Sequence, residues 1–213
     1  MAWALRLFED TLAADGAVAL PEDGMNRVAY VVHGSIMAGG AAFTDDTAWH
    51  GRGTATLRAG REGAAVWRFE LAPAGTPAVV ATGGRTLEKL RAPLALPEAP
   101  LLMRCDSVAF PPGGCAFLHT HQGPGIRCLI EGGIRIDTHG RSTAYAPGGA
   151  WFEDGPEPVF AQAAADRSSR FIRVMVLPAR LLGQSSIRYV REEDQAKPKS
   201  QRYKGYLDTP ITL

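Results

Sequence analysis

Two histidines, His119 and His121, are separated by one residue in the segment GGCAFLHTHQGPGIRCLIEGG, residues 113–133. The whole chain of 213 residues contains only five histidines. On a β-strand, residues i and i+2 face the same side, so both imidazoles would project together. Two imidazoles on one face can give two nitrogen ligands to one metal ion. The alternative is a pair of exposed or hydrogen-bonded histidines at the edge of a loop.

A carboxylate that could complete such a site follows in GGAWFED, residues 148–154. Glu153 has the same strand parity as Trp151, so it faces the interior if Trp151 does. Two histidines and one carboxylate with open positions suit Fe(II), Mn(II) or Ni(II), and zinc also tolerates this set. Glu153 could instead be an ordinary carboxylate paired with an arginine. Glu131 is a second, weaker candidate for the carboxylate ligand.

Three neighbouring residues are candidates for contact with a substrate. Cys115 alternates with His119 and would line the same face, either beside a metal or as a packed thiol. Arg127 could bind a substrate carboxylate through two points, or it could be a solvated strand arginine. Trp151 is an aromatic wall residue of the same predicted interior.

The segment around His119 and His121 resembles the first conserved motif of the cupin superfamily. That motif has Gly, five residues, His-x-His, three or four residues, Glu, about six residues and Gly, and Gly113 and Gly132 also match it. Residues 143–163 resemble the second motif loosely. The resemblance implies a jelly-roll β-barrel with a divalent metal bound to the two histidines. Oxygenase, isomerase, hydrolase and decarboxylase activities are all compatible with it.

The sequence departs from this pattern at the other metal ligands. Gly125 stands where the motif has glutamate. Pro158 or Val159 stands near the expected histidine of the second motif, and neither side chain binds a metal. Gln162 is the nearest counterpart of the family asparagine, which makes it a further candidate for substrate contact. Without a replacement such as Glu153, two imidazoles alone would hold a divalent ion poorly.

The chain also shows an internal repeat. Residues 28–38 resemble residues 127–137, and residues 41–73 resemble residues 143–178, with Trp49 aligned to Trp151. Both copies have strands, glycine turns and an aromatic-Ala-Trp group in the same order, which favours a duplication. The resemblance then becomes one to a bicupin. Pro21 and Asp23 fall where the histidines stand, so the amino-terminal copy is predicted to be structural.

Short apolar runs separated by glycine and proline predict an all-β fold made of tandem double-stranded β-helix (jelly-roll) barrels. Helical signals are weak: residues 3–14 could form a short helix or an edge strand, and residues 85–94 contain helix formers up to Pro93. Predicted strands lie at Val28–Val32, Gly53–Ala59, Ala65–Leu71, Leu101–Phe110, Gly125–Ile130, Gly133–Thr138, Thr143–Ala146, Val159–Ala163 and Phe171–Leu177.

The predicted domain organisation has four parts. Residues 1–90 form a degenerate cupin-like barrel, residues 91–100 form an extended connector, and residues 101–183 form the barrel that carries the histidine pair. Residues 184–213 form a polar carboxy-terminal strap, which we expect to lie extended over the other half of the chain. Such barrels commonly pair through sheet edges, so a homodimer is expected.

Composition excludes several function classes. The chain has 23 basic and 22 acidic residues, so no basic surface for nucleic acid or an anionic membrane is expected. No apolar stretch reaches the 18 residues of a membrane span, and the first residues do not resemble a signal peptide. Three cysteines without CxxC spacing argue against disulfides and structural zinc, which predicts a reducing, cytoplasmic location.

Two functions therefore remain open from the sequence. The first is a metal-dependent enzyme for a small molecule, with His119, His121 and Glu153 as ligands; an oxygenase that cleaves a ring or a carbonyl compound is the favoured guess. The second is a non-catalytic module that binds a sugar or an organic acid in the same barrel. The substrate, the metal and the reaction are not determined by the sequence.

Overall fold

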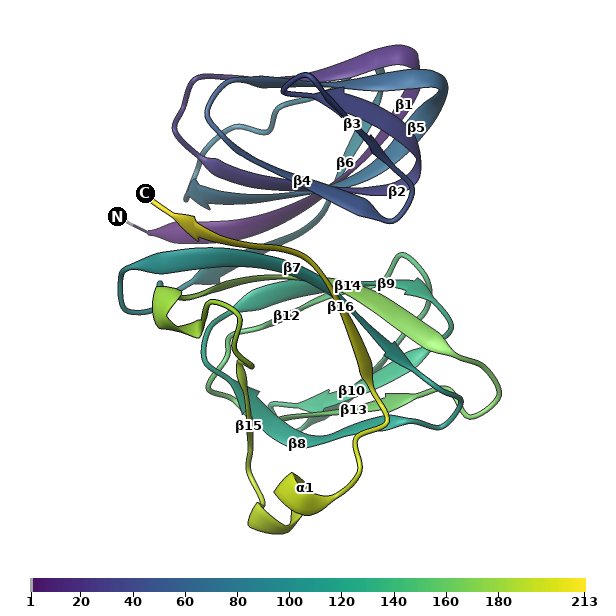
Figure 1. The fold of residues 1–213 in the computed structure, drawn as a ribbon, viewed down its shortest axis with the longest axis vertical. Helices are drawn as coiled ribbons and strands as arrows, with labels where there is room; N and C mark the ends of the chain where they lie inside the picture. Colours follow the sequence, from purple (N-terminus) through teal and green to yellow (C-terminus); the bar gives the residue numbers. More distant parts are fainter. Residues whose placement is uncertain (1) are drawn as a thin grey trace. The chain divides into compact units, whose positions relative to one another are not determined.

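The computed structural model describes residues 2–213 and divides into two compact units (Figure 1). The amino-terminal unit contains residues 2–94 together with Thr212–Leu213, and the carboxy-terminal unit contains Ala95–Ile211. Almost all regular structure in both units is β-strand.

The amino-terminal unit is one sheet of long strands that curves around its own core. The strand order is β3-β2-β5-β1-β6, and β4 also pairs with β2. Shifts of register break the long ladders, for example between Leu12 and Ala17 of β1, and such bulges bend a strand. The strands are β1 (Trp3–Leu20), β2 (Asn26–Ala38), β3 (Ala41–Thr44), β4 (Thr47–Arg52), β5 (Ala55–Pro73) and β6 (Thr82–Leu94).

The carboxy-terminal unit consists of two five-stranded sheets, with orders β11-β10-β13-β8-β15 and β12-β9-β14-β7-β16. Apolar residues of both sheets form its core. Its elements are β7 (Leu101–Phe110), β8 (Cys115–His121), β9 (Gly125–Glu131), β10 (Ile134–Thr138), β11 (Arg141–Tyr145), β12 (Ala150–Glu153), β13 (Val159–Ala163), β14 (Ser169–Pro178), the 3-10 helix η1 (Ala179–Leu181), β15 (Ile187–Tyr189), α1 (Glu192–Ala196) and β16 (Arg202–Ile211).

All nine predicted strands overlap observed strands, although Gly53–Ala59 and Ala65–Leu71 both fall within the single strand β5. Two weak segments differ from the expectation. Residues 3–14 belong to β1, which lies between β5 and β6 and is therefore not an edge strand. Residues 85–94 belong to β6, because pairing with β1 overrides the helix preference of the isolated segment. The predicted connector is therefore shortened at its start, since β6 continues to Leu94.

The polar tail also differs from the expected strap over the other half. β15 pairs with β8 and β16 pairs with β7, so most of the tail extends the two sheets of the carboxy-terminal unit. It thereby supplies an outer strand to each sheet of the unit that carries the histidine pair.

Strand pairing follows the same order in the two units: β4-β2-β5-β1 in one and β12-β9-β14-β7 in the other. In each unit, a tryptophan on the first of these strands is paired with a residue on the second strand. That residue is paired in turn with an arginine on the third strand. The two rows of paired residues are Trp49, Ala29 and Arg68, and Trp151, Arg127 and Arg173.

Charged side chains are buried in the amino-terminal unit as a closed network. Glu70 accepts bonds from Arg6, Arg27 and Arg68, and all four side chains are at most 1% exposed. Arg68 also donates to Asp10 at 2.7 Å. The attraction between these charges offsets the free-energy cost of burying them. The network therefore stabilises the fold only while all of its members are present.

Loss of Glu70 should therefore destabilise the amino-terminal unit strongly. Glu70→Ala leaves three buried guanidinium groups without a shared carboxylate, which should lower the free energy of unfolding by about 3 kcal/mol or more. Glu88→Ala is the control, because Glu88 pairs with Arg91 at a partly exposed site and should cost less than about 1 kcal/mol. Urea unfolding measures both; equal midpoints for the two variants would contradict the role of the network.

Candidate metal and ligand site

The two histidines lie on β8 and both point into the carboxy-terminal unit, where each is 5% exposed. Their Nε2 atoms are 3.2 Å apart and their rings are nearly perpendicular, at 86°. The pair is therefore buried, although His121 is the last residue of β8. Both side chains point to the same face of β8, as the i, i+2 spacing predicts for a strand.

Hydrogen bonds at the other ring nitrogens orient these imidazoles. His119 Nδ1 lies 2.6 Å from the carbonyl oxygen of Phe117, and since a carbonyl only accepts, Nδ1 carries the proton. The neutral ring therefore has its lone pair on Nε2, directed at His121. His121 Nδ1 lies 3.3 Å from Ser186 Oγ, a hydroxyl that can donate or accept and so permits either tautomer of His121.

Glu153 from β12 reaches the same point. Its Oε2 atom lies 3.4 Å from His121 Nε2, and Trp151 Nε1 donates to its Oε1 at 2.8 Å. Arg127 Nη2 lies 2.8 Å from the same Oε2, but neither atom has a well-aligned hydrogen bond. The sequence left two alternatives for Glu153: a position beside the histidines, or a pairing with an arginine. The structure combines the two, because Glu153 lies close to His121 and is also paired with Arg127.

Arg127 and the strand backbone fill the space of the missing glutamate. Arg127 Nη1 donates to the carbonyl of Gly125 at 2.6 Å. A Cβ atom on Gly125 would lie 2.6 Å from the Val174 carbonyl oxygen and 3.0 Å from Arg127 Nη1. A glutamate at this position therefore has no room. Val159 stands near the expected histidine of the second motif. It pairs with His119 and is 2% exposed, so the interior beside His119 is apolar at this position.

Burial and charge keep the site in one protonation state. Burial lowers the pKa of His121 to about 3 and also lowers that of His119, so both rings are neutral near pH 7. Burial would raise the pKa of Glu153, but the Arg127 charge and His121 outweigh it and lower that pKa. Burial lowers the pKa of Arg127 to about 10, which still leaves it charged. The site contains neutral imidazoles beside an ion pair.

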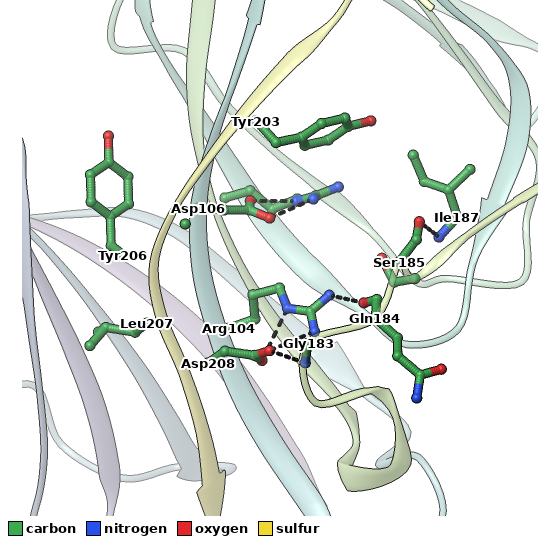
Figure 2. Close-up of a pocket in the computed structure, with 13 residues that line it drawn as sticks. Arg104, Asp106, Gly183, Gln184, Ser185, Ile187, Tyr203, Tyr206, Leu207 and Asp208 are labelled. Carbon is green, nitrogen blue, oxygen red and sulfur yellow. Dashed lines mark hydrogen bonds and ion pairs between the residues drawn. The ribbon is translucent and has the colours of Figure 1, made fainter.

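Two cavities adjoin one another here. The inner one has about 20 Å³, enough for about one water molecule or ion, and it is lined by both histidines, Arg127 and Glu153. The outer one has about 510 Å³ and lies beside β7, β16 and residues 183–187 (Figure 2). Arg173 and Tyr203 are among the residues that line both cavities.

Sequence comparison identifies no relative: no protein-family model and no curated protein matches this sequence. Solved structures do match it. The oxalate decarboxylase of Lactobacillus farciminis, in a formate complex, has a TM-score of 0.66 and 12% identity over 91% of this chain and 82% of the other. A mutant Bacillus subtilis oxalate decarboxylase gives 0.62 and 13% over 91% and 73%. A cupin 2 conserved barrel domain protein from Leptotrichia buccalis gives 0.50 and 14% over 82% and 84%.

The chain has a cupin fold. At these identities the likeness concerns the fold, and the activity must be argued from the side chains.

Within this cupin fold, only part of a metal site is prepared. Two nitrogen ligands at about 2.1 Å from one ion, at angles of about 90–110°, lie roughly 3.0–3.4 Å apart, and the histidine Nε2 atoms are 3.2 Å apart. Across residues 2–213, however, no group of three or more His, Cys, Asp or Glu side chains is arranged to hold a metal ion. The spacing of the histidines is compatible with one divalent ion, whereas the nearest carboxylate oxygen, Glu153 Oε2, is paired with Arg127 at 2.8 Å.

Two of the expected contact residues lie elsewhere in the cupin barrel. A register shift in the pairing of β8 with β13 changes the alternation, so Ala116 lines the inner cavity and Cys115 does not. Gln162 donates to the carbonyls of Gly113 and Gly114 and lines neither cavity. Trp151 packs in the core against Tyr145 and reaches the site through Glu153.

Glu131, the weaker carboxylate candidate, is also away from the histidines. Its side chain is 59% exposed and pairs with Arg170 at 3.1 Å. It belongs to the solvent side of the sheet.

Sequence reasoning missed three residues at the site. Arg173 on β14 pairs with Asp106 on β7 at 2.7–2.8 Å, and both are buried. Ser186, which contacts His121, comes from the tail. Tyr203 on β16 lines both cavities. A buried arginine flanked by apolar residues in FIRVMVLP was a signal for Arg173, whereas the polar tail gave none for Ser186.

No helix among the described residues has the length and apolar character needed to cross a bilayer.

The buried neutral state of His121 should make stability depend on pH. Its pKa is about 3 in the folded chain and about 6.5 in the unfolded chain, so only the unfolded chain takes up a proton as pH falls below 6.5. The free energy of unfolding should therefore fall by on the order of 1 kcal/mol between pH 7 and pH 5.5 through this residue.

His121→Asn should remove that part of the pH dependence in protein treated with a chelator. His33→Asn is the matched control, because the His33 side chain is 78% exposed. Urea unfolding at both pH values measures the difference. The same pH dependence in the parent and in His121→Asn would show that His121 is not held neutral by burial.

Proposed function

We propose that the carboxy-terminal barrel binds one divalent transition metal through His119, His121 and Glu153 and serves as an enzyme for a small molecule. One observation carries the proposal. Two neutral, buried imidazoles direct Nε2 atoms toward one point, where the distance between these atoms is 3.2 Å, and the Glu153 Oε2 atom, which is paired with Arg127 at 2.8 Å, lies 3.4 Å from His121 Nε2.

The surrounding hydrogen bonds support metal binding by the histidines. A histidine that binds a metal through Nε2 usually donates Nδ1–H to a carbonyl or another polar group. His119 does so to the Phe117 carbonyl, and His121 can do so to Ser186. The Ser186 hydroxyl in turn donates its proton to Met175 Sδ, with 3.8 Å between Oγ and Sδ, so its oxygen is free to accept from His121. With both Nδ1 atoms protonated, two lone pairs meet at 3.2 Å, an arrangement that a cation stabilises.

The candidate metals are Fe, Mn, Ni and Zn, since histidine and carboxylate ligands suit all four. When bound, the metal supplies Lewis acidity that polarises an oxygen of the substrate. Arg127 holds Glu153 in place and balances its charge. The inner cavity has room for the ion alone, so the substrate would lie in the outer cavity and reach inward past Arg173 and Tyr203.

We also propose that the two units are duplicated cupin barrels, of which only the second retains ligand chemistry. The common strand order and the equivalent rows of paired residues support this. Arg68 and Arg173 occupy equivalent places in these rows. In the first barrel, buried ion pairs take the place that the histidines and the cavity have in the second.

A non-catalytic module that binds a sugar or an organic acid is the second candidate. The observation that favours it is the pairing of Arg127 with Glu153, because this pair balances the interior charge without a metal. A module of this kind would be stabilised by its ligand in the absence of metal, whereas the enzyme requires metal first.

Metal binding should depend on the histidine pair. Protein prepared without a nickel column and treated with a chelator should bind about one Mn²⁺ or Zn²⁺ in calorimetry, and the double variant His119→Ala/His121→Ala should lose this binding. His139→Ala is the control, because its exposed ring lies 3.9 Å from Asp154 and Glu157 on the surface. Equal metal content in the double variant and the parent would overturn the proposal.

Removal of the competing arginine should strengthen the metal site. Arg127→Met frees Glu153 and removes one positive charge beside the ion, so we expect metal affinity to rise by about tenfold or more, which corresponds to about 1.4 kcal/mol. The variant should be less stable than the parent without metal, because it buries an unpaired carboxylate, and added metal should restore its melting temperature. An unchanged or weaker affinity would exclude Glu153 as a ligand.

A further inference from the structure

The outer cavity has the features of a binding site in its own right. Its volume of about 510 Å³ falls within the range of 300–1,000 Å³ typical of small-molecule sites. All of its lining residues come from the carboxy-terminal unit, and they combine one buried and one partly exposed ion pair with aromatic and aliphatic side chains. Figure 2 shows Tyr203 on one side of Asp106 and Arg104 on the other.

The two arginines of this cavity differ in their free hydrogen-bonding capacity. Arg104 uses Nε, Nη1 and Nη2 on Asp208 and on the carbonyls of Gln184 and Leu181, at 2.6–3.1 Å. Arg104 therefore closes a wall of the cavity and offers no nitrogen without a partner.

Arg173, in contrast, is 5% exposed and uses only two of its nitrogens. Nε and Nη2 donate to Asp106 at 2.8 and 2.7 Å, and Nη1 makes no hydrogen bond with the described residues. Nη1 is not one of the fully buried side-chain atoms that lack a hydrogen bond, so it is accessible from the cavity and can donate to an acceptor supplied by a ligand. Burial alone would lower the pKa of Arg173, but the Asp106 carboxylate outweighs it and raises that pKa, so the group stays charged.

Apolar surface stands next to this donor. The Tyr203 ring lies over the guanidinium, with 5.9 Å between its centroid and Arg173 Cζ, and Tyr203 is 49% exposed. Ile187 lines both cavities as well. A flat or aliphatic group can therefore pack against Tyr203 and Ile187 while a polar group reaches Arg173.

The charge of the cavity argues against a ligand with more than one negative group. Arg173 with Asp106 and Arg104 with Asp208 are two neutral pairs, so the cavity offers no surplus charge for a dianion. Charged acceptors form the stronger hydrogen bonds with a guanidinium, which favours a carboxylate over a neutral carbonyl.

We propose that the outer cavity binds a monocarboxylate with an aromatic or aliphatic body, its carboxylate on Arg173 Nη1 and its body on Tyr203 and Ile187. The proposal rests on the proposed function, because it names the chemical class of the substrate for the outer cavity, although none of these contacts involves a proposed metal ligand. A carboxylate held here lies at the wall that the outer cavity shares with the inner one.

The test uses phenylacetate and its neutral isostere 2-phenylacetamide with the full chain, treated with a chelator. Metal-free protein separates this test from that of the metal site. Calorimetry or ligand-observed NMR should show phenylacetate binding at least about tenfold more tightly than the amide, as expected for one charged hydrogen bond. Absence of phenylacetate binding, or equal binding of both probes, would overturn the proposal.

Two variants locate the site. Tyr203→Ala should weaken both probes, because it removes the ring that both contact. Arg173→Met/Asp106→Leu replaces the buried pair by apolar side chains and should abolish the preference for phenylacetate.

Asp208→Asn is the matched control within the same cavity, because Arg104 keeps an oxygen acceptor at position 208 and both of its carbonyl acceptors. It should retain the preference for phenylacetate. If the double variant does not fold, the comparison of the two probes in the parent and in Tyr203→Ala still decides the question. Full retention of phenylacetate binding in Tyr203→Ala would contradict the site.

Discussion

The interior of the carboxy-terminal unit depends on the pairing of Arg127 with Glu153. These are charged groups in a space that excludes water, and each is tolerated there only because the other is present. The pair also governs the histidines. Glu153 lies beside His121, while the positive charge of Arg127 opposes protonation of both rings. Under the proposed function, the same four side chains would balance their charges without a metal and would also supply the ligands that hold one.

The two units use buried charge differently. In the amino-terminal unit, Glu70 is shared by three arginines, and the network is closed on itself. In the carboxy-terminal unit, Arg173 is paired on one side only and faces a cavity on the other. The two arginines thus differ in their surroundings, because Arg68 pairs with two carboxylates and Arg173 pairs with one and lines a cavity.

Local patterns in the sequence were sufficient for the fold and for half of the site. Strand parity placed His119 and His121 on one face, and it placed Glu153 inward together with Trp151. Strand alternation wrongly placed Cys115 on the same face as His119. The register shift that changes its direction arises from the pairing of β8 with β13, and the local order of apolar and polar residues does not reveal it. Arg173 and Asp106 are 67 residues apart, and their contact follows from the pairing of β14 with β7. Such a contact requires the register of the sheet, which the sequence pattern alone does not give.

The contact between Ser186 and His121 makes the end of the chain part of the histidine site. Ser186 lies beyond the last strand of the barrel core, in the segment that leads to β15. A shortened chain that stopped after β14 would keep both imidazoles and Glu153 but lose the Ser186 hydroxyl that contacts His121 Nδ1, as well as Tyr203. Truncation or proteolysis near residue 183 would thus remove a contact of the His121 ring together with the outer strands β15 and β16.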